Sequence, residues 1–180
     1  MIRSNLRRPL IPAALALVAL AACVVNLDFD YTVTGQAVQA VETSNTINAA
    51  IPINLAAQPD IQQHAGNITS LTLSSLTLTV SAVQPDNTVA TITGSLSLRP
   101  SGVTDNSQDV FVGALTAYPI AVGSGVQLLG TPALDTFALA TIKGSGQFQA
   151  IITGDTTGGP TADFAVDIQL SMSMGYDSSL

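Results

Sequence analysis

Strict alternation of apolar and polar side chains near the end of the chain most constrains what it can fold into. Every second residue over 164–174 is apolar, and the residues between them are Ala, Asp, Gln and Ser. A period of two places the apolar side chains on one face of a β-strand and the polar ones on the other. The segment therefore predicts a strand between a packed core and water. The run is unusually long, so we expect a bend or a bulge within it.

The residues before this strand predict its partner. Segment 146–154 reads as a second strand, and 155–160, with the sequence DTTGGP, is rich in turn-forming residues. Two strand segments joined by such a connection are typical of a β-hairpin. We therefore expect a long C-terminal hairpin in which 146–154 pairs with 164–174.

A second strong strand signal covers 68–83, where the parity of the apolar positions changes at Ser74-Ser75. A slip of one residue would turn every later side chain to the wrong face. We therefore expect either a β-bulge at the two serines or a break into two strands. A turn at 84–87 and a further strand at 89–100 follow, and they predict another antiparallel hairpin. The inward side of 89–100 is expected to carry Ala90, Ile92, Leu96 and Leu98.

One segment, 131–144, predicts a short helix instead. Its apolar residues recur at helical spacing. Thr131 suits the N-cap and Pro132 the first helical position. Lys143 falls in the last turn, and Gly144 follows directly after it.

The remaining strand signals are weaker and complete the prediction of the fold class. Residues 27–33 alternate, and 109–118 is a shorter strand candidate. Residues 60–66 are consistent with one helical turn, and 36–58 receive no assignment. Seven or so short strands with turns between them predict a mainly β fold. We expect an antiparallel β-sandwich with one short helix, and the alternative is a small β-barrel.

The start of the chain follows another pattern. Arg3, Arg7 and Arg8 precede an apolar run over 10–25, about 16 residues long and interrupted by Pro12. A bilayer-spanning helix needs roughly 20 residues. A positively charged start, a short apolar stretch and small residues at its end are typical of a secretory signal.

The last residues of this signal are Leu20-Ala21-Ala22-Cys23, and Cys23 is the single cysteine of the chain. This stretch resembles the lipobox of bacterial lipoproteins, in which an apolar residue and two small residues precede an obligatory cysteine. The resemblance covers the signal region only. It implies cleavage before Cys23 and attachment of a diacylglyceryl group to the thiol. Because one acyl chain binds a membrane only marginally, two or three chains are needed for a stable anchor. The alternative is an ordinary signal, cleaved after Ala21.

The resemblance also implies a domain organisation and a location. Residues 1–22 would be the signal peptide, 23–26 the lipidated cysteine with a short tether, and 27–180 a single β-sandwich domain. Three tether residues reach roughly 10 Å, so the domain is expected to sit against the bilayer. Val24 follows the cysteine, where enterobacterial lipoproteins that stay in the inner membrane have Asp. The resemblance thus implies the outer membrane in a Gram-negative organism.

Charge and composition exclude some partners. Cleavage before Cys23 would leave Arg99 and Lys143 against twelve acids, a formal net charge of 2 − 12 = −10. A surface this acidic does not attract nucleic acid or anionic lipid headgroups. The absence of Trp also weakens a sugar-binding interpretation.

The sequence carries few groups for catalysis or metal binding. His64 is the only histidine, and we expect it in an exposed loop. A Ser or Cys nucleophile needs a base, and zinc prefers His and Cys ligands, so we predict no enzyme and no cofactor. Asp28 and Asp30 share a strand face, which is expected to face water.

A weak calcium candidate lies at 105–109, where Asp105, Ser107 and Asp109 have the 1-3-5 spacing of a calcium loop. The segment lacks the Gly and the acid that such a loop has at positions six and twelve, so a solvated turn is the alternative.

Together these observations predict a lipid-anchored envelope protein with a structural or protein-binding role, attached to the membrane through Cys23. An alternative is a carrier of an apolar ligand such as a lipid, because Met172 and Met174 share one strand face and methionine lines adaptable pockets.

Overall fold

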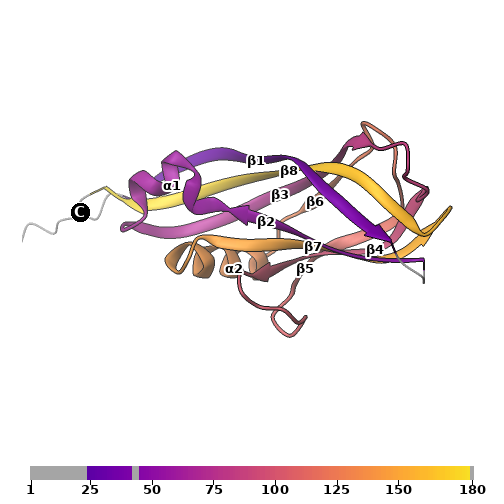
Figure 1. Ribbon diagram of the computed structural model, residues 1–180. Helices are drawn as coiled ribbons and strands as arrows, with labels where there is room; N and C mark the ends of the chain where they lie inside the picture. The colour runs from indigo at the N-terminus through magenta and orange to yellow at the C-terminus, as the bar shows by residue number, and fades with distance from the viewer. Residues whose placement is uncertain (1–23, 42–44, 179–180) are drawn as a thin grey trace, which may run out of the picture.

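Two four-stranded antiparallel sheets, stacked face to face, make up the protein (Figure 1). The computed structural model describes residues 24–41 and 45–178. Sheet A has the strand order β1-β8-β3-β6 and sheet B the order β2-β7-β4-β5. The strands are β1 Val24–Val41, β2 Thr46–Asn54, β3 Ile68–Val83, β4 Thr91–Pro100, β5 Val110–Pro119, β6 Gly125–Leu129, β7 Gln147–Thr157 and β8 Thr161–Asp177. The β-sandwich prediction is confirmed, and the small barrel is wrong, because the described strands form two separate sheets.

The order of the strands is that of an eight-stranded jelly roll. The chain changes sheet at every connection except the one between β4 and β5. The first and last strands, β1 and β8, pair along almost their whole length in sheet A. Each sheet therefore contains strands from both halves of the chain.

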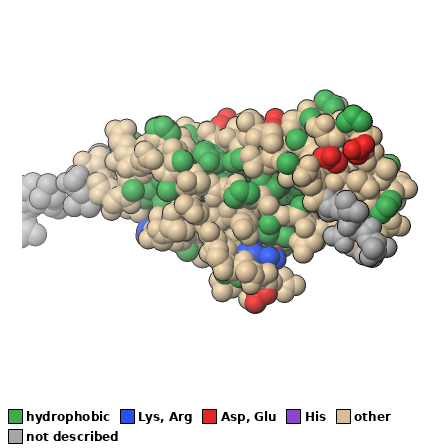
Figure 2. Space-filling model, in the orientation of Figure 1, with side chains coloured by type: hydrophobic (Ala, Val, Ile, Leu, Met, Phe, Trp, Pro, Cys, Tyr) green, Lys and Arg blue, Asp and Glu red, His purple; other side chains and the backbone are tan. Residues whose placement is uncertain are grey.

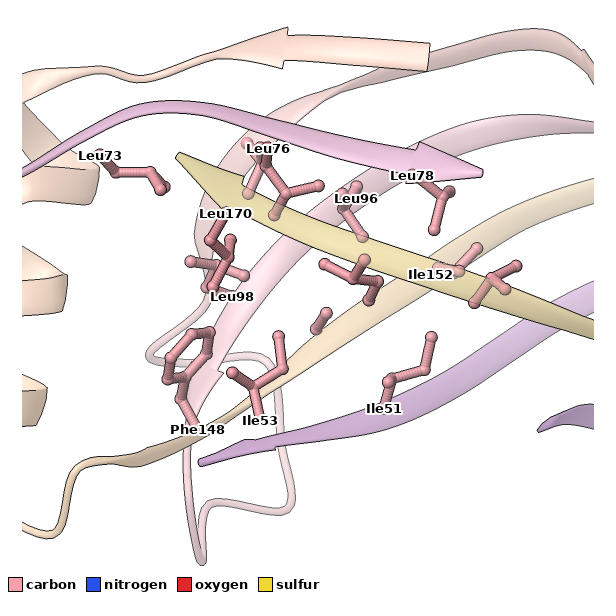
Figure 3. Close-up of a cluster of buried hydrophobic side chains, with 14 of the residues drawn as sticks. Ile51, Ile53, Leu73, Leu76, Leu78, Leu96, Leu98, Phe148, Ile152 and Leu170 are labelled. Atoms are coloured by element: carbon pink, nitrogen blue, oxygen red, sulfur yellow. The ribbon is translucent and has the colours of Figure 1, made fainter. Parts of the chain in front are cut away.

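The core lies between the sheets and is built from the alternating apolar residues (Figure 3). Sheet A contributes leucines of β3 and the inward face of β8, and sheet B contributes branched residues of β2, β4 and β7. Every inward side chain over 164–174 is buried, whereas most residues between them are half-buried. The strand predicted from this alternation is confirmed.

Both predicted hairpins are wrong. β7 and β8 follow one another in the chain but lie in different sheets, and so do β3 and β4. Alternation specifies which face of a strand is buried, but strands of both sheets bury one apolar face against the core. The pattern therefore does not tell which of the two sheets a strand joins. The turn at 84–87 is present, with the Asn87 N–H donating to the Gln84 carbonyl at 3.0 Å, but it leads from one sheet to the other.

The bulge predicted at the two serines is confirmed, and β3 continues through it as one strand. The pairing of β3 with β8 passes from Leu73–Met172 to Ser75–Ser171, so Ser74 is an extra residue without a partner in β8. The irregularity expected within 164–174 lies instead in the neighbouring strands. β3 has two further bulges, and β1 has one, whereas β8 keeps a regular alternation.

The Ser74 bulge also docks the segment that leads into the helix. The Leu73 N–H donates to the Asp135 carboxylate at 2.8 Å, and the Ser74 carbonyl accepts from the Gly130 N–H at 2.9 Å. A bulge frees backbone groups from the strand ladder. These groups are used here to hold the start of the helix against sheet A.

The predicted helix is confirmed as α2, Pro132–Lys143. The Thr131 side chain accepts from the Leu134 N–H at 3.4 Å, and the apolar side of the helix packs against β3. Phe137 meets Phe148 of β7 edge to face, with 5.6 Å between the ring centroids.

The other expectations need smaller corrections. The helical turn expected at 60–66 is α1, Pro59–His64, and the unassigned region holds the end of β1, β2 and a 3-10 turn, Leu55–Ala57. β4 begins at Thr91, so Ala90 lies outside the strand and is exposed instead of facing the core.

None of the helices in the described residues is long and apolar enough to span a membrane.

Candidate functional site

The expected lipidation site, Cys23, lies outside the described residues, but the strand that begins at the next residue is described. β1 begins at Val24, so the residues expected as a tether, 24–26, belong to a strand. Val24 pairs with Asp177 and Val25 with Tyr176 of β8, and both valines are exposed. The end of the sandwich that carries Val24 is the one where α1 lies (Figure 1). We call it the anchor end.

His64 lies at the anchor end and is not the exposed loop residue that we expected. It is the last residue of α1 and is half-buried. Its ring stacks on Tyr176, with 3.7 Å between the centroids and 18° between the planes. His64 thus joins α1 to β8, and its position assigns it a packing role.

Asp28 and Asp30 lie on the outer face of sheet A and are exposed, as expected. They border a shallow hollow of about 330 Å³, together with Ser74 of the bulge and Ser171 of β8. The two carboxylates are two residues apart on an open strand surface, without a basic side chain among the lining residues.

A hollow of about 540 Å³ lies on the outer face of sheet B, and we call it the sheet B hollow. Its sheet side is formed by polar residues of three neighbouring strands: Asn48 of β2, Ser95, Ser97 and Arg99 of β4, and Thr153 of β7. Its other side is the connection between β4 and β5, residues 101–109, through Thr104, Asp105, Asn106 and Asp109.

An ion pair holds this connection against the sheet. Arg99 Nε and Nη2 donate to the two carboxylate oxygens of Asp109, at 2.6 and 2.8 Å. Arg99 also donates to the Thr104 carbonyl at 3.4 Å. The side chains of the pair are 11% and 17% exposed, and the hydrogen bond that Arg99 donates to Asp109 raises the pKa of Arg99. In Figure 2, blue and red side chains lie close together on the protrusion below sheet B.

Asp105 and Asp109 of the calcium candidate line the same hollow, but the structure gives their carboxylates other partners. Asp105 accepts hydrogen bonds from the side chain and the N–H of Ser107, and Asp109 is bound by Arg99. Over 24–41 and 45–178, His, Cys, Asp and Glu form no cluster of three that could hold a metal ion. Calcium binding at 105–109 stays a prediction.

Two apolar residues on this outer face were not predicted to matter. Ile151 of β7 points away from the core, opposite Ala50 and Ser97, yet it is only 1% exposed. Phe111 of β5 pairs with Ser97 and is 59% exposed. The apolar pair at Val110 and Phe111 breaks the alternation of the strand, and that break is the one sequence signal that marks Phe111.

Met172 and Met174, the basis of the apolar-ligand alternative, are buried in the core between the sheets. Met172 lies opposite Phe29 and Leu73, and Met174 opposite Leu27 and Leu71. Both methionines are therefore core residues, packed beside apolar side chains of β1 and β3.

Comparisons with known proteins give fold similarity only. No family model and no curated protein matches this chain. Among solved structures, a Desmodium yellow mottle tymovirus protein is 12% identical with a TM-score of 0.38, covering 97% of this chain and 95% of that chain. The BFDV capsid protein, solved as a decamer, is 15% identical with a TM-score of 0.43, covering 84% and 99%. A protein of the Macrobrachium rosenbergii nodavirus is 6% identical with a TM-score of 0.41, covering 99% of this chain and 95% of that chain. Similarities of this size assign no function to this chain.

Proposed function

We propose that this chain is a lipid-anchored protein of the bacterial cell envelope with a structural or protein-binding role at the membrane surface. The observation that carries the proposal is the start of β1 at Val24, the residue directly after the lipobox-like cysteine. The anchor would therefore be joined to a folded strand, without a linker between them.

The pairing at the start of β1 supports close contact with the bilayer. Val24, Val25 and Asn26 pair with Asp177, Tyr176 and Gly175 of β8, so these residues are not free to extend. One residue spans at most about 3.6 Å, which sets the distance between the acyl chains and the domain. A protein anchored in this way keeps the anchor end at the membrane and directs its opposite end away from it.

The composition of the anchor end agrees with this placement. Val24 and Val25 are exposed apolar side chains, and the half-buried Tyr176 lies beside Val25. Tyrosine is enriched where a protein meets the membrane–water interface. The Val after the cysteine also agrees with transport to the outer membrane, as the lipoprotein resemblance implies.

The rest of the surface supports a binding role more than a catalytic one. His64 packs on Tyr176, and the carboxylates of Asp105 and Asp109 are held by Ser107 and Arg99. Apart from a few apolar residues such as Phe111, the outer faces of both sheets are polar, and they stay exposed in an anchored protein. They offer the area for contact with other envelope proteins.

The intact mass of the protein purified from membranes tests the anchor. We expect a mass for cleavage before Cys23 plus two or three acyl chains, and a Cys23→Ser variant that lacks the added mass and leaves the membrane fraction. A Cys23→Ser variant with the same mass and the same fractionation as the wild type would overturn the anchor.

Crosslinking in intact cells tests the protein-binding role separately. We expect a specific envelope protein to be recovered with the wild type and not with the Cys23→Ser variant, because the variant no longer stays at the membrane surface. Failure to recover any partner, with lipidation confirmed, would count against protein binding and leave the anchor standing.

A further inference from the structure

Six of the nine residues that line the sheet B hollow carry neutral side chains that both donate and accept hydrogen bonds. Hydroxyls come from Ser95, Ser97, Thr104 and Thr153, and amides from Asn48 and Asn106. Its volume of about 540 Å³ falls within the roughly 300–1,000 Å³ of sites for small ligands. A ligand that fits such a wall carries many neutral donors and acceptors of its own.

Several of these groups are available to a ligand. In the described part of the chain, the side chains of Ser97, Asn48 and Asn106 form no hydrogen bond. Ser95 and Thr153 share one hydrogen bond between their hydroxyls, at 3.3 Å. Ser97 and Asn48 stand on strands of the same sheet, so their positions are fixed by the ladder, as a binding site requires.

The charges around the hollow disfavour a charged ligand. Arg99, the only basic side chain in the lining, is occupied by both oxygens of Asp109. Asp105 is held by two hydrogen bonds from Ser107. An anion would meet two carboxylates and a guanidinium that is already paired, and a cation would compete with the hydrogen bonds to Asp105.

An aromatic ring lies beside the polar lining. Phe111 points outward from β5, opposite Ser97, and is 59% exposed. Cross-strand neighbours on one face have Cβ atoms about 4.5–5.5 Å apart, so the ring is within reach of a ligand bound at Ser97. A sugar ring presents C–H groups on one face and hydroxyls at its edge. It matches a phenyl ring next to hydroxyl and amide groups, so the exposed Phe111 supplies the flat ring that a chain without Trp would otherwise lack.

We infer that the sheet B hollow is a binding site for a neutral saccharide of one or two rings. Phe111 covers one face of the sugar, while Ser97, Asn48 and Asn106 bind its hydroxyls. Arg99 and Asp109 are positioning residues, because their ion pair holds the 101–109 connection at the edge of the hollow. The inference does not depend on the lipid anchor.

The test uses the full chain, purified from whole-cell extract in a detergent without a sugar headgroup. Glucose, N-acetylglucosamine, maltose and cellobiose are titrated by calorimetry and by saturation-transfer NMR, with glucuronate as the charged comparison. We expect at least one neutral sugar to bind and glucuronate to bind more weakly than glucose. Phe111→Ala is expected to weaken binding about tenfold, and Ser97→Ala with Asn106→Ala by a similar factor.

Leu129→Ala is the matched control, because Leu129 is a 73% exposed apolar residue on sheet A, away from the hollow. It is expected to leave binding unchanged, and unfolding curves confirm that each variant is folded. The inference is overturned if none of the four neutral sugars binds the folded wild type, or if Phe111→Ala and the Ser97/Asn106 variant bind as the wild type does. Tighter binding of glucuronate, or binding of Ca²⁺ without any sugar, also overturns it.

Discussion

The phenol of Tyr118 connects the two sheets at one edge of the sandwich. Tyr118 lies on β5 of sheet B, and its hydroxyl is 2.8 Å from the Ser124 carbonyl and 3.2 Å from the Leu78 carbonyl, both next to or within sheet A. Burial raises the pKa of Tyr118 from 10.0 to about 12. The folded protein therefore holds this proton at a pH where the unfolded chain has released it.

This difference predicts a loss of stability at high pH. A raised pKa in the folded state means that the contribution of Tyr118 is complete below pH 10 and is lost as the pH rises towards 12. Tyr118→Phe is expected to lower the free energy of unfolding by about 1 kcal/mol at neutral pH, because the hydrogen bond is removed. The substitution should also make the free energy of unfolding fall less steeply between pH 10 and 12. Denaturant unfolding of both proteins over this range measures the two effects, and equal slopes would contradict the assignment.

The carboxylate of Asp105 gives a second prediction at the level of one side chain. The hydrogen bonds from the Ser107 hydroxyl and N–H lower the pKa of Asp105 below its ordinary 3.8. Ser107→Ala removes the first of these bonds, so the pKa of Asp105 should rise towards 3.8. A carbon-detected NMR titration measures it, with Asn106→Ala as the control that leaves both bonds in place. An unchanged pKa in Ser107→Ala would show that the hydroxyl does not act on Asp105.

The sequence predicts where a strand, a helix or a bulge lies better than it predicts which strands pair. α2 and the Ser74 bulge were predictable because their signals are local: a cap, helical spacing, and a change of parity. The partners of β7 and of β8 were not predictable, since consecutive strands of a sandwich carry the same alternation whether they share a sheet or not. β6 is only five residues long and gave too short a pattern to recognise.

The Ser74 bulge predicts an asymmetry between two deletions in β3. Without Ser74, Leu73, Ser75 and Leu76 alternate regularly, so the core side chains keep their face. The deletion removes the hydrogen bonds to Asp135 and Gly130 and should cost about 1–3 kcal/mol while the protein still folds. Deleting Thr77 turns Leu78 outward and should prevent folding. Circular dichroism and denaturant unfolding compare the two, and a folded Thr77 deletion would show that the register is not fixed in this way.

On the scale of the complete sandwich, the pairing of β1 with β8 joins the two ends of the described chain. β8 is an inner strand of sheet A and contacts both β1 and β3. Folds dominated by pairings between distant segments fold slowly, in milliseconds to seconds. The sheet B hollow follows the same logic, since Asn48, Ser97 and Thr153 come from three distant strands. No local motif could have identified it, and only the topology brings these residues together.

A chain that ends at Thr157 should therefore remain unfolded. It lacks β8, so β1 and β3 lose their common partner and the core loses the buried side chains of β8. We expect a flat unfolding signal for the truncated chain, whereas the intact protein shows a cooperative transition. Cooperative unfolding of the truncated chain would mean that sheet B folds without sheet A.

The start of β1 at Val24 has a mechanical consequence. β1 has 18 residues and extends over about 60 Å at 3.3 Å per residue, away from the anchor end. If Cys23 is lipidated and a partner binds the opposite end, as proposed, a tension between the membrane and that partner would run parallel to β1. The hydrogen bonds between β1 and β8 would then be loaded together in shear, and would not break one after another. β1, the longest of the described strands, would therefore lie along the direction of the applied force.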